Sequence, residues 1–198
     1  MDYGLPYSIV PPLKFNTVQQ DVYRGAYPRE INFPFLQSLQ LKTIISLTPQ
    51  PITPETDGKL YQFSKDNNIQ LIHIECEKSG KGKKRGVPLG YTAVLTAINY
   101  IIHTQHAPIY IHCLNGGQVT SLLVACLRKL QFWSSLTIFN EFINFTTNIT
   151  VNDRSFVDNF QGDIMVDPGY KVEWLWNGMS RGVVNGHPKL KIHHKGEI

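Results

Sequence analysis

Short runs of apolar residues, many of them β-branched, alternate along the first half of the chain with longer helical stripes. The runs at residues 43–47, 69–74 and 109–112 are bounded by prolines or polar residues, as is typical of buried strands. Residues 22–24 predict a further strand at the edge of the same sheet. The pattern therefore predicts three central strands and one edge strand.

The helical stripes lie between and after these runs. Residues 60–67 precede the second strand, and the stripe at 93–102 follows Pro88, a residue that favours helix starts. Stripes at 119–130 and 136–143 come next, with a short helix at 156–160 that Asn152 or Asp153 would cap. This order predicts an α/β fold with a mostly parallel central sheet flanked by helices and a helical C-terminal half.

Helical periodicity ends near Asp163. We expect residues 1–163 to form one domain, because a chain of 198 residues with 42% hydrophobic content is typical of a single globular core. Residues 164–198 would form a C-terminal extension with a basic end. We expect its first half to pack against the domain and its last ten or so residues to be mobile.

Composition excludes several classes of protein. Cys76, Cys113 and Cys126 lack paired short spacings, which argues against disulfides and zinc, and we expect neither a metal nor a cofactor. No signal peptide pattern or apolar run of about 18 residues is present, so we expect a cytoplasmic protein with no membrane partner. A net charge of +4 favours anionic ligands only weakly, and no reading motif points to nucleic acid.

The segment after the third central strand carries the candidate chemistry. His112 and Cys113 end the strand, Gly116 and Gly117 follow, and a helix is predicted from about Gln118. Loop amides and a helix N-terminus that converge on one point form an anion site and favour a cysteine thiolate, which is a competent nucleophile. These residues are equally compatible with a small buried cysteine beside a flexible turn.

Several motifs outside this loop help to decide between an anion site and a buried cysteine beside a turn. They include residues 11–18, 22–28, 32–36 and 41–47 before the loop, and 126–133 and 138–142 after it. Together with the loop, these motifs resemble the atypical dual-specificity tyrosine phosphatases of plants and fungi. Among the fungal members, the set named for oxidant-induced cell-cycle arrest is the most similar. The resemblance covers about residues 11–161 and implies a cysteine-phosphatase fold with Cys113 at the nucleophile position.

The loop departs from the pattern of the active members, in which Asn, Arg, Gly, Lys, His, Arg and Thr follow the cysteine. This chain has, in the same order, Leu114, Asn115, Gly116, Gly117, Gln118, Val119 and Thr120. The resemblance assigns Val119 to the position of the arginine that clamps the phosphoryl group, a role worth about 10³–10⁵ in rate. We therefore interpret Cys113 as a vestigial nucleophile. Thr120 would orient its thiolate or cap the helix.

A general acid and substitute cations are the other parts that phosphoryl transfer requires. Residues 75–86 contain no aspartate, and Glu77 is the candidate acid, although the sequence favours a solvated loop carboxylate over this role. Lys83, Lys84 and Arg85 are candidate anion-binding residues or members of a solvated basic loop.

Three functions remain open from the sequence. The first is a pseudophosphatase that works as one subunit of a hetero-oligomer with related phosphatase-like proteins, as the resemblance implies. The second is a weak cysteine-dependent phosphatase, and the third is a non-catalytic binder. Inositol pyrophosphates, inositol polyphosphates or other phosphorylated molecules are the candidate ligands of the last two.

Overall fold

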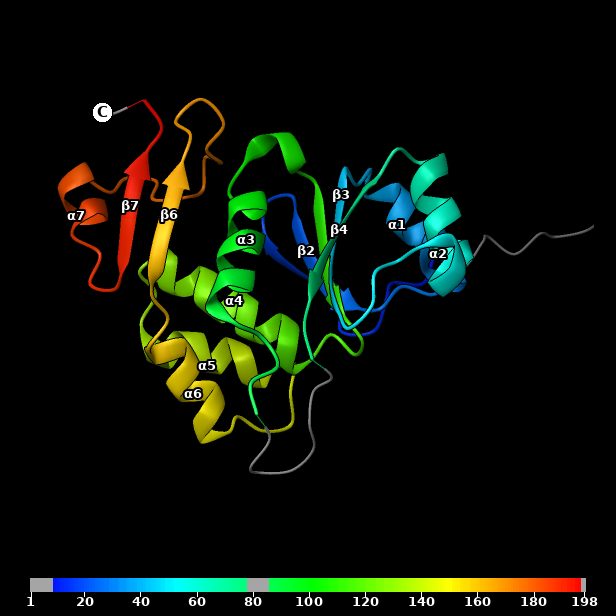
Figure 1. Cartoon of the computed structure of the whole chain (residues 1–198), viewed down its shortest axis with the longest axis horizontal. Helices are drawn as coiled ribbons and strands as arrows, with labels where there is room; N and C mark the ends of the chain where they lie inside the picture. The colour runs from blue at the N-terminus through cyan, green and yellow to red at the C-terminus, as the bar shows by residue number, and fades with distance from the viewer. Residues whose placement is uncertain (1–8, 78–85, 197–198) are drawn as a thin grey trace, which may run out of the picture.

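A five-stranded sheet forms the centre of the computed structural model, which describes residues 9–77 and 86–196 (Figure 1). The strand order is β1-β2-β5-β3-β4, and every pairing is parallel except that of β1 with β2. A separate parallel pair, β6 and β7, follows near the C-terminus. The strands are β1 (Asn16–Gln19), β2 (Val22–Ala26), β3 (Thr43–Thr48), β4 (Gln70–Glu75), β5 (Ile109–Cys113), β6 (Gly162–Val166) and β7 (Leu190–His194).

Helices cover both faces of the central sheet (Figure 1). Helices α1 and α2 lie on one face, and α3 to α6 lie on the other. The α-helices are α1 (Phe33–Ser38), α2 (Pro54–Asp66), α3 (Tyr91–Ile101), α4 (Gln118–Leu130), α5 (Ser135–Ile143), α6 (Val151–Asp158) and α7 (Arg181–Asn185), and the 3₁₀ helices are η1 (Glu30–Asn32) and η2 (Thr104–His106).

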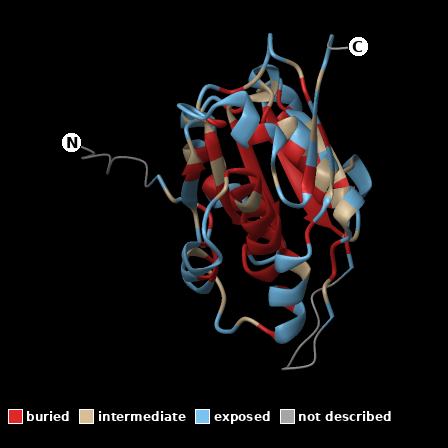
Figure 2. Cartoon of the chain, turned by 90° about the vertical axis from the view of Figure 1, so that its left-hand side faces the viewer, coloured by how far each residue is buried: buried red, intermediate tan, exposed pale blue. Residues whose placement is uncertain are grey.

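The sheet divides the core into two apolar clusters because successive side chains of a strand point to opposite faces. Ile44 and Tyr110 pack under α1 and α2, whereas their neighbours Ile45 and Ile111 join the larger cluster under α3 and α4. Buried residues accordingly gather in the interior, and exposed residues cover the outer surfaces (Figure 2). Helix α4 is buried at every position except Lys129, which makes it the central helix of the domain.

The α/β fold and the three central strands are as predicted, but two local expectations are wrong. Residues 22–24 do not form an edge strand, since β2 lies between β1 and β5. The predicted cap of the last short helix is also wrong, because Thr150 precedes α6 and its side chain accepts from the Asp153 N–H. Asp153 instead completes a capping box by accepting from the Thr150 N–H.

The C-terminal segment contains strands that its pattern did not predict. Its first half packs against the domain as expected: β6 lies against α3, and Trp176 Nε1 donates to the Leu130 carbonyl at 2.7 Å. Within the last ten or so residues, β7 pairs with β6 over five residues, and the expected mobility of this end stays a prediction. The division of the chain at residue 163 stays a prediction.

Candidate phosphate-loop site

The candidate loop lies where β5 ends and α4 begins, as the sequence predicts. Cys113 is the last residue of β5, and Gln118 is the first of α4. Gly116 makes the intervening turn possible: its φ is +65°, and a Cβ there would lie 2.7 Å from the Ala26 nitrogen. The loop therefore packs directly against the end of β2, and a side chain at position 116 would displace it.

The side chain of Asn115 turns back into this loop. Its Oδ1 accepts from the Gly117 N–H at 2.9 Å and from the Cys113 thiol at 3.7 Å. Cys113 is buried, with 2% of its surface exposed. The residue that could serve as nucleophile is thus a hydrogen-bond donor to a neighbouring carboxamide.

Val119 faces the cavity beside Cys113. The side chain is buried, and the cavity has a volume of about 220 Å³. No lysine or arginine lines this cavity within residues 9–77 and 86–196. Its lining consists of Leu47, Pro49, Cys76, Glu77, Cys113, Leu114, Asn115 and Val119.

Gln118 and Thr120 take structural positions in the first turn of α4. Gln118 Nε2 donates to Asp153 Oδ1 at 2.6 Å, so this side chain ties α4 to α6. Thr120 Oγ1 is buried and has no hydrogen-bond partner in the described part of the chain. Gly117 occupies the N-cap position of α4, so the expectation that Thr120 caps the helix is wrong, and no contact shows it orienting the thiol.

His112 lies on the opposite face of β5 from Cys113. Its Nε2 lies 2.8 Å from Ser46 Oγ, and its ring meets Tyr27 edge to face. Complete burial lowers the pKa of His112 to about 4, chiefly because desolvation disfavours the charged ring. His112 is therefore neutral at physiological pH, and its contacts with Ser46 and Tyr27 stabilise β5 on the face opposite Cys113.

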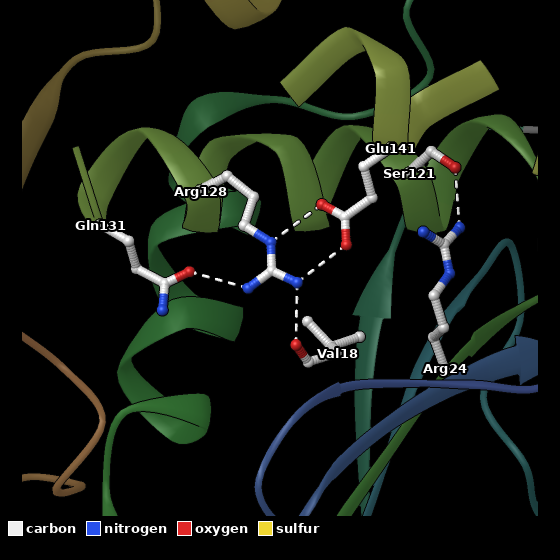
Figure 3. A network of polar contacts seen from close by, with 6 residues as sticks. All are labelled: Val18, Arg24, Ser121, Arg128, Gln131 and Glu141. Atoms are coloured by element: carbon white, nitrogen blue, oxygen red, sulfur yellow. Dashed lines mark hydrogen bonds and ion pairs between the residues drawn. The ribbon is translucent and has the colours of Figure 1, made fainter. Parts of the chain in front are cut away.

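Arg24 is a site residue whose role the sequence did not reveal. Arg24 Nη2 donates to the Gly116 carbonyl at 3.2 Å. The same nitrogen donates to Ser121 Oγ at 2.7 Å (Figure 3). Its guanidinium also lies 3.6 Å from the centre of the Phe145 ring. Arg24 thus joins β2 to the loop and to α4.

Lys14 is a second cation that reaches the loop from a distant part of the sequence. Its Nζ donates to the Phe145 carbonyl at 2.8 Å. The same Nζ lies 3.3 Å from the position that a Cβ on Gly117 would occupy. The resemblance assigns a lysine to position 117 in active members, so here a lysine from the N-terminal turn lies next to that position.

The candidate acid, Glu77, is brought to the same cavity as Cys113, together with Cys76. Desolvation is the main factor that raises the pKa of Cys76 to about 11, so this thiol is protonated at neutral pH. Lys83, Lys84 and Arg85 lie outside the described residues.

A second cavity of about 250 Å³ adjoins the first, and Pro49 and Leu114 line both. Tyr27 lies on its wall and donates to Asp57 Oδ2 at 3.0 Å. The described residues contain no cluster of three or more histidine, cysteine or acidic side chains that could hold a metal ion. None of the described helices has the length and apolar character that a membrane span requires.

Comparison with known proteins agrees with this geometry. The OCA6 protein of Saccharomyces cerevisiae is 43% identical over 180 residues, which cover 85% of this chain and 80% of OCA6. The inositol diphosphatase DSP4 of Arabidopsis thaliana is 34% identical over 152 residues, 76% of this chain and 73% of DSP4. Both relatives therefore extend over the loop and most of the surrounding fold.

A solved structure is similar over the same region. The core catalytic domain of the PP-IP phosphatase SIW14 from Saccharomyces cerevisiae, in complex with citrate, superimposes with a TM-score of 0.68 at 29% identity. The match covers 78% of this chain and 89% of that domain. A sequence model of the tyrosine phosphatase family matches residues 9–178, which contain both sheet-flanking helix layers and the loop at Cys113. The chain belongs to the tyrosine phosphatase family.

Proposed function

We propose that the chain is a pseudophosphatase that acts as one subunit of a complex with related phosphatase-like proteins. The observation that carries the proposal is the cavity beside Cys113, which the buried Val119 side chain lines. The resemblance assigns this position to the arginine that clamps the phosphoryl group. An isopropyl group donates no hydrogen bond and carries no charge, so it cannot stabilise the transition state of phosphoryl transfer.

Two further features support a loop without turnover. Asn115 Oδ1 lies 3.7 Å from Cys113 Sγ and accepts from the Gly117 N–H, so a loop amide that could contact a phosphoryl oxygen is already in use. Glu77 is the only carboxylate among the cavity-lining residues that the structure describes, and no aspartate, the usual general acid, is among them. We also propose a cytoplasmic location, which rests on the sequence pattern alone.

Affinity purification with quantitative identification of partners tests the proposal. The tagged chain is expected to recover related phosphatase-like chains in fixed proportion. The purified chain alone is expected to show no hydrolysis of phosphotyrosine or inositol pyrophosphate above that of Cys113→Ser. Turnover that Cys113→Ser abolishes would contradict the non-catalytic part of the proposal, and recovery of no related chain would contradict the complex.

The alternative is a weak phosphatase or a binder of inositol pyrophosphates. The retained backbone path from Cys113 to Gln118 supports it, as do the names of relatives that are inositol diphosphatases. Lys83, Lys84 and Arg85 would then supply the missing cations. This alternative predicts that replacing all three with alanine weakens inositol polyphosphate binding in calorimetry, whereas the pseudophosphatase proposal predicts no change in partner recovery.

A further inference from the structure

A histidine in the turn before β7 connects the C-terminal segment to the last turn of α4. We propose that His187 is a pH-sensitive contact: its neutral ring holds residues 186–196 on the domain, and its protonation releases them. The contact lies at the opposite end of α4 from the loop at Cys113, and it does not depend on the proposed subunit role.

The His187 ring uses both of its nitrogens. Nδ1 lies 3.2 Å from the Lys189 nitrogen and 3.0 Å from the Leu190 nitrogen, and both of these are backbone N–H donors. Nδ1 must therefore accept, which leaves the ring proton on Nε2. Nε2 then donates to the Lys129 carbonyl at 3.0 Å. These contacts define a neutral ring with one fixed tautomer.

A proton on Nδ1 is incompatible with this arrangement. An imidazolium carries N–H groups on both nitrogens, so Nδ1 would become a donor that faces two donors. The Lys189 and Leu190 N–H groups would lose their acceptor at the turn that leads into β7. Desolvation is the main factor that lowers the pKa of His187, and the charge of Lys129 acts in the same direction. The hydrogen bond to the Lys129 carbonyl acts the other way without reversing the shift.

The end of α4 is where the C-terminal segment is attached. Carbonyls in the last turn of a helix lack partners further along the helix and commonly accept from other groups. Here the Lys129 carbonyl accepts from His187 and the Leu130 carbonyl from Trp176 Nε1, at 2.7 Å. The Phe132 ring, just after α4, lies 4.7 Å from the His187 ring. His187 therefore attaches the part of the segment that leads into β7.

Positive charges accompany the ring on the elements packed around it. Lys129 lies on α4, Lys189 follows in the same turn and donates from Nζ to Asn159 Oδ1 at 3.4 Å, and Arg181 begins α7. No hydrogen bond or ion pair joins the ring to a carboxylate in the described part of the chain. A proton added to His187 therefore gains no ion pair.

Other histidines near the segment would also respond to acid. His193 on β7 lies 2.7 Å from Asp163 Oδ1, and its protonation would strengthen this pair, but both side chains are more than half exposed, so the gain is small. The rings of His103 and His106 lie 5.3 Å apart, and the His103 ring stacks on Tyr170. Acid would place like charges on this pair, so the experiment must isolate His187.

Hydrogen exchange of the full chain, read by mass spectrometry at pH 7.5 and 5.5 and corrected for intrinsic exchange rates, tests the proposal. We expect the opening of residues 186–196 to become about five- to tenfold more frequent at pH 5.5, because a released ring takes up a proton. A free histidine with a pKa near 6.5 is about ten times more often charged than neutral at pH 5.5, which sets the upper limit. Peptides from the middle of α4 report any change in the whole domain.

Two variants remove the titration in different ways. His187→Asn keeps an acceptor near the position of Nδ1, and His187→Gln keeps a donor directed toward the Lys129 carbonyl. Both should show an opening of residues 186–196 that is the same at the two pH values. His193→Gln is the matched control, since it removes a histidine of β7 that takes no part in this contact, and it should keep the response of the parent.

A parent chain whose opening is the same at both pH values would overturn the proposal. So would a response of the parent's size in both His187 variants, or a response that His193→Gln abolishes. These outcomes concern the C-terminal segment of the isolated chain. Failure of the proposal would therefore leave the result of the partner experiment unaffected.

Discussion

Two buried arginines, Arg24 and Arg128, lie near opposite ends of α4 (Figure 3). They differ in how many of their guanidinium nitrogens form hydrogen bonds. Arg128 forms a two-pronged ion pair with Glu141 at 2.8 Å on both prongs, and its other hydrogens reach Gln131 and the Val18 carbonyl. Arg24 uses only Nη2, while its Nε and Nη1 are buried without partners in the described residues. Burial also lowers the pKa of Arg24 to about 10, mainly through desolvation.

This difference in hydrogen bonding distinguishes Arg128, which stabilises the packing of helices, from Arg24, which supports the loop. Arg128 joins α4 to α5 and to the N-terminal segment through paired charges, which is what a stable core requires of a buried ion. Arg24 holds the loop through neutral acceptors, the Gly116 carbonyl and Ser121 Oγ, and no carboxylate among the described residues pairs with it. Hydrogen bonding is thus more complete around Arg128 than around the loop from Cys113 to Gln118.

The largest expected loss of stability follows from replacing Arg128, whose hydrogen bonds and ion pair are the more complete. Arg128→Met leaves Glu141 without its partner, and we expect the free energy of unfolding to fall by about 3–5 kcal/mol in a denaturant titration. Lys59→Met, which breaks the exposed pair with Glu30, should leave the midpoint unchanged. Equal effects of the two variants would remove the basis for calling Arg128 structural.

Acid should weaken the strand that carries the loop. The pKa of His112 is lowered from 6.5 to about 4 in the folded chain, so below pH 6.5 the unfolded chain binds a proton that the folded chain does not. The contribution to stability is therefore complete above pH 6.5 and is lost as the pH falls toward 4. We expect a loss of about 3 kcal/mol over this range. In His112→Gln the loss should be smaller by that amount, and an identical pH profile would exclude His112 as its source.

Removing the incompletely paired arginine should cost less. Arg24→Met deprives the Gly116 carbonyl and Ser121 Oγ of a donor but also relieves a buried charge, so we expect about 1–2 kcal/mol of destabilisation. Because the loop loses a support, Cys113 should react faster with iodoacetamide than in the parent. Arg24→Lys keeps the charge and serves as the control. A loss of stability as large as that of Arg128→Met would contradict the inference that Arg24 contributes less to stability than Arg128.

The smallest effect is expected when Val119 is replaced. Val119→Arg introduces the arginine that the resemblance assigns to this position, but Asn115 Oδ1 still accepts from the Gly117 N–H and lies 3.7 Å from Cys113 Sγ. Turnover of phosphotyrosine should therefore stay at the level of the parent chain. A rise of a hundredfold or more would contradict this expectation and show that Val119 alone limits turnover.

The fold was predictable from sequence where hydrophobic periodicity is strong and local. Runs such as 43–47 and the long stripe that became α4 carry their own signal, so β3, β5 and α4 appear where expected. The pair β6 and β7 was missed because each strand is short and its partner lies 28 residues away along the chain, at Gly162 and Leu190. Pairing over such a distance leaves no local pattern.

Of the candidate site, only the residues of the loop itself could be predicted from the sequence. The positions from His112 to Thr120 follow from the motif, whereas Arg24 and Lys14 reach the loop from segments 92 and 131 residues away from their acceptors. A charged residue inside the apolar strand β2 was the available signal for Arg24. The inward turn of Asn115 depends on backbone geometry that residue types alone do not specify.

The most direct test of the central claim compares hydrolysis by the purified chain and by Cys113→Ser, with phosphotyrosine and an inositol pyrophosphate as substrates and with the SIW14 catalytic domain as a positive control. The account predicts that the parent and the variant are indistinguishable while the control turns over. Hydrolysis by the parent at a rate near that of the control, abolished in Cys113→Ser, would contradict it.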